Sequence, residues 1–322
     1  MISGFPAFIL NWVSIIAISS LIVVGLITIS TQFNNVHFER FSVDARRSLL
    51  WLAALSPWII GILAGFITLS SGGDYWAAKL SSVVFHWHHP REFILASWHG
   101  ASIAISIIYV MYVAVGHILK LLDSGNKLNT LVALAEPLDS DIQRLDTDTP
   151  AAFTAGYLKP RSYITQALLS QLSDEEFSIV KLHEKEHARR YDPVKKCLFQ
   201  LLTALFPRNV SQRLNQSMTT AMEQSADRAI LDEVPDRATI AATLLKVRRL
   251  VAQPIHLQTD TSFICNYGID NIEQRIEYLL TEDKGRSIPV LATFLIFFSM
   301  SVLCAMSADF IHHTIEYTLS HY

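Results

Sequence analysis

The stretch 182–193, "LHEKEHARRYDP", decides how the fold of this chain is interpreted. It places two histidines, His183 and His187, four residues apart, with Glu184 directly after the first. In a helix this spacing puts both imidazoles on one face, one turn apart, as two ligands of a zinc ion require. Glu184 is rotated so that its carboxylate can reach a metal-bound water instead. Glu186 projects from another face, and we expect it to be a surface residue.

The residues before and after this stretch favour a helix that ends sharply. "SDEE", 173–176, is a capping-box pattern with Ser173 as N-cap and Glu176 three positions later. The helix should continue to about Arg190 and stop before Asp192-Pro193, because a residue before proline avoids helical geometry. The HExxH spacing can also arise by chance. Its position after a capping box argues for a metal site.

A third metal ligand has to come from elsewhere, because catalytic zinc keeps three protein ligands and one open position. Glu223 is the candidate, on a helix predicted over about 209–231. Asp227 follows it by four residues on the same face and is well placed to accept the second N–H of a ligating histidine. Zn²⁺ is therefore the predicted cofactor.

The segment 151–169, "AAFTAGYLKPRSYITQALL", is typical of a β-hairpin. Gly156 and Pro160 would weaken a central strand, so we expect an edge position. The stretch "LVALAEPLDSDIQRL" indicates one or two short strands before the hairpin. Helices are predicted over 236–251 and 269–281, and 194–206 is an apolar amphipathic stretch that belongs either to the core or to the bilayer surface.

The composition indicates a polar domain set among membrane segments. Hydrophobic residues make up 51% of the 322 residues and charged residues 17%, below the roughly 25% of a water-soluble domain. Residues 120–287 hold 21 of the 26 Lys+Arg and 23 of the 29 Asp+Glu. Since a bilayer core needs about 20 apolar residues in a helix, four segments qualify as spans. They are about 6–30, 49–71, 94–119 and 288–308.

This division gives three transmembrane helices in 1–119, a polar domain in 120–287, and a fourth helix with a short outward tail in 288–322. A cleaved signal peptide is disfavoured for the first segment, which lacks a basic start and has too long an apolar run. The loop 31–48 carries Arg40, Arg46 and Arg47. The positive-inside rule puts that loop and the polar domain in the cytoplasm, with both termini outward.

The charge of the chain argues against nucleic-acid binding, and its cysteines argue against disulfides and cysteine metal sites. The net charge is -3 and there is no basic arm, so nucleic-acid binding is unsupported. The cysteines at 197, 265 and 304 are isolated, and we expect neither a disulfide nor a cysteine metal site.

Three further groups of residues carry weaker expectations. The tract "HWHH", His86–His89, is either a metal-binding tract or a cluster at the membrane edge. His99 lies in an apolar segment, where a hydrogen bond to a neighbouring helix is expected. Tyr191 and Arg228 are candidates for oxyanion stabilisation, with a surface role as the alternative.

The order of the motifs resembles that of a known family. "AAFTAG", "VKLHEKEHARRYDP", "EQSADRAI" and "IEQRIEYLL" follow one another as in the BlaR/MecR-type membrane zinc peptidases, the antirepressor or beta-lactam sensor-transducer family. More distantly the chain resembles the HtpX-type membrane proteases. The likeness covers roughly 120–308. Only 14 residues follow residue 308. We therefore expect no penicillin-binding sensor domain and no beta-lactam sensing by this chain itself.

The resemblance implies a fold and a set of roles. It implies an α-helical multi-pass membrane protein with four transmembrane helices and a cytoplasmic α+β gluzincin-like zinc metallopeptidase domain. It implies zinc ligation by His183, His187 and Glu223, with Glu184 as catalytic base. It further implies that the strand 152–158 holds the substrate, through residues Ala152, Phe153, Thr154, Ala155 and Gly156.

The expected activity is that of a zinc metalloendopeptidase in a bacterial-type inner membrane, with the lipid bilayer and a protein substrate as partners. One role is signalling, by site-specific cleavage of a transcriptional repressor or by self-cleavage. A second is quality control of membrane proteins. The third alternative is a non-catalytic membrane receptor with a structural zinc, and the intact Glu184 argues against it. A homo-oligomer is compatible with the sequence.

Overall fold

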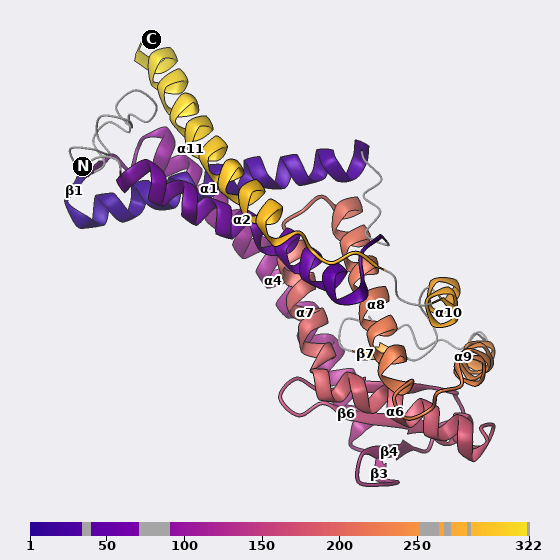
Figure 1. Cartoon of the computed structure of the whole chain (residues 1–322). Helices are drawn as coiled ribbons and strands as arrows, with labels where there is room; N and C mark the ends of the chain where they lie inside the picture. The colour runs from indigo at the N-terminus through magenta and orange to yellow at the C-terminus, as the bar shows by residue number, and fades with distance from the viewer. Residues whose placement is uncertain (34–39, 71–90, 252–263, 267–271, 282–284, 321–322) are drawn as a thin grey trace.

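The computed structural model describes residues 1–33, 40–70, 91–251, 264–266, 272–281 and 285–320. Long helices gather at one end of the molecule, and a β-sheet with shorter helices forms the other end (Figure 1). The N-terminus and the C-terminal end of the last helix both lie at the end remote from the sheet (Figure 1).

Among the described residues, four helices are long and apolar enough to cross a membrane. They are α1 (Phe5–Phe33), α2 (Val43–Ser70), α4 (Trp98–Val132) and α11 (Val290–Ser320). Four spans were predicted at these places; α1, α4 and α11 end beyond their predicted segments, whereas α2 begins six residues before its segment. Helix α4 continues to Val132, and α11 continues to Ser320.

Polar contacts join the ends of the long helices that lie remote from the sheet. Strand β1 (Ile2–Ser3) pairs antiparallel with β2 (Glu92–Phe93), just before α4. His99 Nε2 on α4 lies 3.0 Å from His312 Nδ1 on α11, which confirms the predicted bond to a neighbouring helix. The tract His86–His89 lies outside the described residues.

The main sheet has the strand order β3-β4-β6-β5-β7. Its strands are β3 (Glu136–Pro137), β4 (Ile142–Leu145), β5 (Ala152–Ala155), β6 (Arg161–Thr165) and β7 (Ile264–Asn266). Strands β5 and β6 are antiparallel neighbours, as the hairpin pattern predicts. The turn between them begins at Gly156, whose φ of +111° suits glycine.

The prediction that this hairpin supplies an edge strand is wrong for both strands, because β6 also pairs with β4 and β5 also pairs with β7. Strand β7 pairs antiparallel with the other side of β5, with Phe153 opposite Asn266 and Ala155 opposite Ile264. Gly156 lies just after the strand and Pro160 lies in the turn, so neither interrupts a ladder of hydrogen bonds. The edge that seemed free is therefore covered by a segment from more than a hundred residues later in the chain.

Within the part of the chain that the structure describes, six helices complete this half of the molecule. They are α5 (Gln166–Leu169), α6 (Asp174–Arg190), α7 (Asp192–Thr203), α8 (Arg208–Ile230), α9 (Arg237–Val251) and α10 (Ile272–Leu280). The capping box at the start of α6 is confirmed, with both reciprocal hydrogen bonds between Ser173 and Glu176. The helix ends at Arg190, as predicted. The first residues of the helix predicted over 269–281 lie outside the described residues.

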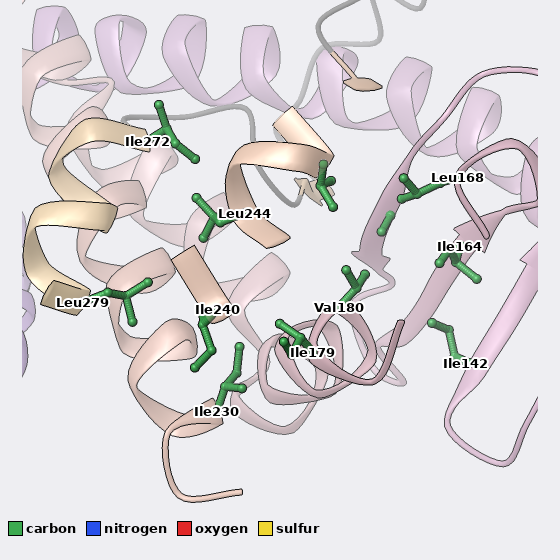
Figure 2. Close-up of a cluster of buried hydrophobic side chains, with 12 residues drawn as sticks. Ile142, Ile164, Leu168, Ile179, Val180, Ile230, Ile240, Leu244, Ile272 and Leu279 are labelled. Carbon is green, nitrogen blue, oxygen red and sulfur yellow. The ribbon is translucent and has the colours of Figure 1, made fainter. Parts of the chain in front are cut away.

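Helix α6 is the central layer of the main hydrophobic core (Figure 2). Its Ile179 and Val180 are fully buried between Ile164 of the sheet on one side and Leu244 and Leu279 of α9 and α10 on the other. The opposite face of the sheet packs against the end of α4, where Leu128 meets Phe153. The sheet and the helices thus hold α6 from two sides.

A second core joins α7 and α8 to the membrane helices. Phe199 of α7 is fully buried with Leu50 and Ala54 of α2 and with Met218 and Met222 of α8. The stretch 194–206 therefore belongs to the core through this face. Because α8 continues from this contact towards the sheet, the two ends of the molecule share one helix.

Candidate metal centre

Two helices bring three predicted ligands together. His183 and His187 come from α6 and Glu223 from α8, and one ligand atom from each lies within 4.8 Å of the others. His183 Nε2 is 3.0 Å from His187 Nε2. The carboxylate oxygens of Glu223 lie 3.3 Å from His183 Nε2 and 3.5 Å from His187 Nε2. His183 and His187 are fully buried, and Glu223 is 2% exposed.

The other nitrogen of each imidazole faces a carboxylate. His183 Nδ1 lies 3.0 Å from Asp227 Oδ1, as predicted for Asp227. His187 Nδ1 lies 2.8 Å from Asp192 Oδ2. Asp192 can reach back because Tyr191 ends α6 in the left-handed conformation, with a φ of 56°, and α7 begins at the next residue. A carboxylate at Nδ1 fixes the proton there and leaves the Nε2 lone pair for a metal.

The arrangement of these donor atoms suits a cation. With both Nδ1 atoms protonated, two Nε2 lone pairs and a carboxylate meet in a space closed to solvent. Such groups repel one another unless a positive charge lies between them. Two imidazole nitrogens and one carboxylate are the donor set of a catalytic zinc site, with a fourth position left open. The residues present therefore fit a bound metal ion.

Glu184 is held by the neighbouring strand. Thr154 Oγ1 of β5 lies 2.7 Å from Glu184 Oε2 and 2.8 Å from the Glu184 carbonyl oxygen, and both residues are fully buried. The other oxygen, Oε1, accepts no hydrogen bond from the residues that the structure describes. Burial raises the pKa of Glu184, although both imidazoles act against the rise. A carboxylate with a raised pKa and a free oxygen is suited to take up a proton.

Arg275 of α10 joins the two acidic residues of α8. Its Nε and Nη2 donate to the two oxygens of Asp227 at 2.8 and 2.7 Å, and its Nη1 lies 3.0 Å from Glu223 Oε2. Its side chain is fully buried. The guanidinium therefore fixes both Glu223, the predicted third ligand, and Asp227, which faces His183.

The pKa values of these acids follow from their charged neighbours. Burial raises the pKa of Glu223, but the Arg275 guanidinium and the His187 ring outweigh it, and the pKa stands well below its usual range. Burial acts in the same way on Asp227, and its contacts with Arg275 and His183 lower the net pKa. Both carboxylates are therefore held in the ionised form that binds a cation.

The prediction that Glu186 is a surface residue is wrong. Glu186 is 8% exposed, because the side chains of Arg189 and Arg190 cover it. Arg189 donates to both of its oxygens at 2.7 Å, and Arg190 also bonds to Ser225 of α8. Glu186 thus helps to hold α6 against α8.

The five residues predicted to hold the substrate lie on and after β5. Ala152 and Thr154 face α6, whereas Phe153 and Ala155 face the end of α4. Gly156 lies in the turn that follows. The oxyanion candidates Tyr191 and Arg228 are both exposed.

Two residues of the centre received no role in the sequence analysis. Asp192 stands in the quoted stretch, where the pair with Pro193 indicated only the end of a helix. Arg275 follows Ile272 by three residues and precedes Leu279 by four, so it stands within the apolar stripe of α10. An arginine in such a stripe is buried only when acidic groups pair with it, which is the signal that could have identified it.

Comparison with known proteins agrees with this geometry. No curated protein gives a significant match to the chain. Residues 74–279, nearly two thirds of the chain, match the family described as BlaR1 peptidase M56. The matched range includes His183, His187 and Glu223. With its membrane-length helices and a buried group that could hold a metal ion, the chain belongs to the BlaR1 peptidase M56 family of membrane metallopeptidases.

Proposed function

We propose that the chain is a zinc-dependent metalloendopeptidase with a gluzincin-type site. His183, His187 and Glu223 would hold Zn²⁺, and Asp227, Asp192 and Arg275 would orient these ligands. The observation that carries the proposal is the convergence of two imidazole nitrogens on one carboxylate, at 3.3 and 3.5 Å, with Glu184 beside them. Zinc, when bound, supplies a water of lowered pKa and polarises the scissile carbonyl.

Glu184 performs the proton transfers in this proposal. Its Oε1 takes the proton from the attacking water, and the same carboxyl group later delivers it to the leaving amine. The bond from Thr154 to Oε2 keeps the carboxylate in place and leaves Oε1 available. Burial of the whole group excludes bulk water that would compete for the proton.

Two variants test this assignment. We expect Glu184→Ala to retain zinc and to lose proteolysis by about 100-fold or more, because general bases contribute about 10² to 10⁴ in rate. His187→Ala should lose both zinc and activity. Zinc content is measured by elemental analysis of gently extracted protein, and proteolysis with an unfolded protein substrate. A Glu184→Ala variant that cuts at the wild-type rate contradicts the mechanism.

The substrate is proposed to bind as an extended strand along β5, where main-chain hydrogen bonds supply affinity. The edge of β5 that does not pair with β6 pairs instead with β7, at residues 264–266. A substrate strand would therefore have to replace β7. The same pairing supports self-cleavage as a second candidate activity, since a segment of the chain itself lies along the strand that flanks Glu184.

Site-specific cleavage in signalling is the role we propose, with a cytoplasmic repressor or the chain itself as substrate. A comparison of the N-termini of cellular proteins with wild-type enzyme and with Glu184→Ala tests it. One or a few new N-termini support signalling. Many N-termini from misfolded membrane proteins would instead identify a quality-control protease.

We also propose that residues 120–287, here called the peptidase half, face the cytoplasm of a bacterial-type inner membrane, with the termini outward. The contacts of Arg46 and Arg47 with α8 support this orientation, because they keep the basic end of α2 and the peptidase half on one side. Protease digestion of sealed inside-out vesicles provides the test. Cleavage within 120–287 without detergent supports the proposal, and protection until detergent is added contradicts it.

A further inference from the structure

The basic end of α2 makes specific contacts in the peptidase half. Arg46 is 6% exposed, and the Arg47 side chain is 17% exposed. Arg46 Nη2 donates to Gln224 Oε1, and Arg47 Nη1 donates to Ser225 Oγ at 3.2 Å. Gln224 and Ser225 directly follow Glu223 on α8. Both arginines are therefore fixed by the peptidase half, next to a predicted metal ligand.

Arg47 also reaches the second metal-binding helix. Its Nη2 lies 3.9 Å from Asp192 Oδ1, and the other oxygen of Asp192 accepts from His187 Nδ1. Asp192 is fully buried. One guanidinium thus lies against the carboxylate that orients His187 and against the helix that carries Glu223.

Arg46 makes a second connection, which passes through Gln224 of α8 to α10. The amide nitrogen of Gln224 donates to the carbonyl oxygen of Gln274 at 3.0 Å. Gln274 precedes Arg275, which holds Glu223 and Asp227. The chain of contacts from α2 therefore reaches all three predicted ligands through residues that do not bind the metal themselves.

The start of α2 is in turn braced against the segment that leads into α11. Ser42 N donates to the Arg286 carbonyl oxygen, and Arg286 N donates to the Arg40 carbonyl oxygen, both at 3.1 Å. A Cβ at Gly285 would lie 2.2 Å from Ser42 N, so this approach requires glycine. The arginines are thus presented from a point where two membrane helices begin.

We propose that Arg46 and Arg47 are positioning residues of the metal centre, which make its affinity for zinc depend on the seating of membrane helix α2 against α8. This inference rests on the proposed zinc site but not on its proteolytic activity. Arg47 acts through Asp192 and Ser225, and Arg46 acts through Gln224. Neither side chain is proposed to touch the metal or the substrate.

The test measures zinc affinity of the full-length protein in detergent or bilayer discs, by competition with a chelating dye. Loss of a residue that orients a metal ligand typically costs about 10- to 100-fold in affinity. We expect Arg47→Met to weaken zinc binding by about tenfold or more, with Arg46→Met having a smaller effect of the same sign. Arg47→Lys keeps the positive charge but loses the guanidinium that contacts both Asp192 and Ser225, so its zinc affinity should lie between those of the wild type and Arg47→Met.

Arg213→Met is the matched control. Arg213 lies on the same helix α8 and donates to the Thr31 carbonyl oxygen at the end of α1, at 3.0 Å, so it also joins the peptidase half to a membrane helix. Its removal should leave zinc affinity within about twofold of wild type. An effect of Arg47→Met no larger than that of Arg213→Met overturns the proposal.

A double-mutant cycle separates this role from a general loss of structure. In the Asp192→Asn background, Arg47→Met should cost clearly less zinc affinity than in the wild type, because the partner through which it acts has been changed. Full additivity of the two losses contradicts the assigned route. Since zinc affinity is measured without a substrate, an inactive wild type would refute the peptidase proposal and leave this test intact.

Discussion

The metal centre buries four acidic side chains close to one another. Glu184, Asp192, Glu223 and Asp227 are each at most 2% exposed. The guanidiniums of Arg275 and Arg47 lie beside three of these acids, Glu223, Asp227 and Asp192. The pKa values of Glu223 and Asp227 are lowered, so both carboxylates are ionised, and a cation held by the two imidazoles and Glu223 would add positive charge beside them. Unpaired buried charge is costly, so the cluster favours metal binding on electrostatic grounds.

Thr154 provides a prediction at the scale of one hydroxyl group. Thr154→Val keeps the side-chain shape but removes the hydrogen bond to Glu184 Oε2. Because hydrogen bonds to charged groups contribute about 1.5–3 kcal/mol, we expect kcat to fall by about tenfold or more as Glu184 loses its position. KM and zinc content should change little. The measurement is steady-state kinetics with elemental analysis of the same samples.

Thr154→Ser is the control for that experiment, because it keeps the hydroxyl. It should retain most of the activity. Equal losses in the valine and serine variants would show that packing of the strand, rather than the hydrogen bond, supports the site.

Individual residues of the centre could be predicted where their roles follow from helical spacing. His183, His187 and Asp227 fall at four-residue steps from their partners, and the structure brings each to the expected neighbour. Thr154 could not be assigned its contact with Glu184, since that contact depends on how β5 packs on α6. Arg275 lies 48 residues from Asp227 in sequence, and no local pattern joins them.

At the scale of elements, α7 is one of the two helices that pack the peptidase half against the membrane helices, together with α8. Its Phe199 is fully buried, and its ring meets that of Trp51 on α2 edge to face, with centroids 5.3 Å apart. We expect Phe199→Ala to destabilise the contact by about 3–5 kcal/mol, the usual cost of a large aromatic cavity. Faster digestion of 120–287 by an added protease, with the full chain in detergent, is the readout.

Leu198 supplies the matched control on the same helix. Its side chain is 47% exposed, so Leu198→Ala should change the digestion rate little. If both substitutions act equally, the face of α7 that bears Phe199 is not the one that holds the two parts together.

The limits of sequence reasoning at this scale are visible in β5. The hairpin of β5 and β6 is local, and its residues predict it. The pairing of β5 with β7 joins segments more than a hundred residues apart, and the edge prediction for β5 failed for that reason. For 194–206 the sequence is compatible with either the core or the bilayer surface, because an amphipathic pattern does not specify what its apolar face packs against. Contacts with α2 and α8 decide it for the core.

Metal removal is the prediction that concerns the whole molecule. A ligand that binds only the folded state stabilises it by about 4 kcal/mol at a thousand times its dissociation constant. Chelation should therefore make the peptidase half exchange its amide hydrogens faster, above all in α6 and α8, while the membrane helices change less. Hydrogen exchange of the full chain, with and without chelator, measures this. His187→Ala should be insensitive to the chelator, and equal responses of both proteins contradict zinc binding at this centre.

Any substrate strand that pairs with β5 has to compete with strand β7 for the same edge. Strand β7 is separated from α9 by 12 residues of sequence and from α10 by five, so it belongs to the same chain as β5. Its pairing with β5 is therefore intramolecular, and a separate chain that pairs with β5 competes with a segment of the same molecule. A competing chain must bind β5 more tightly than β7 does, or be present at a high concentration, to displace β7. Peptides that pair weakly with β5 would therefore fail to displace β7, and only a substrate that pairs strongly would reach the strand.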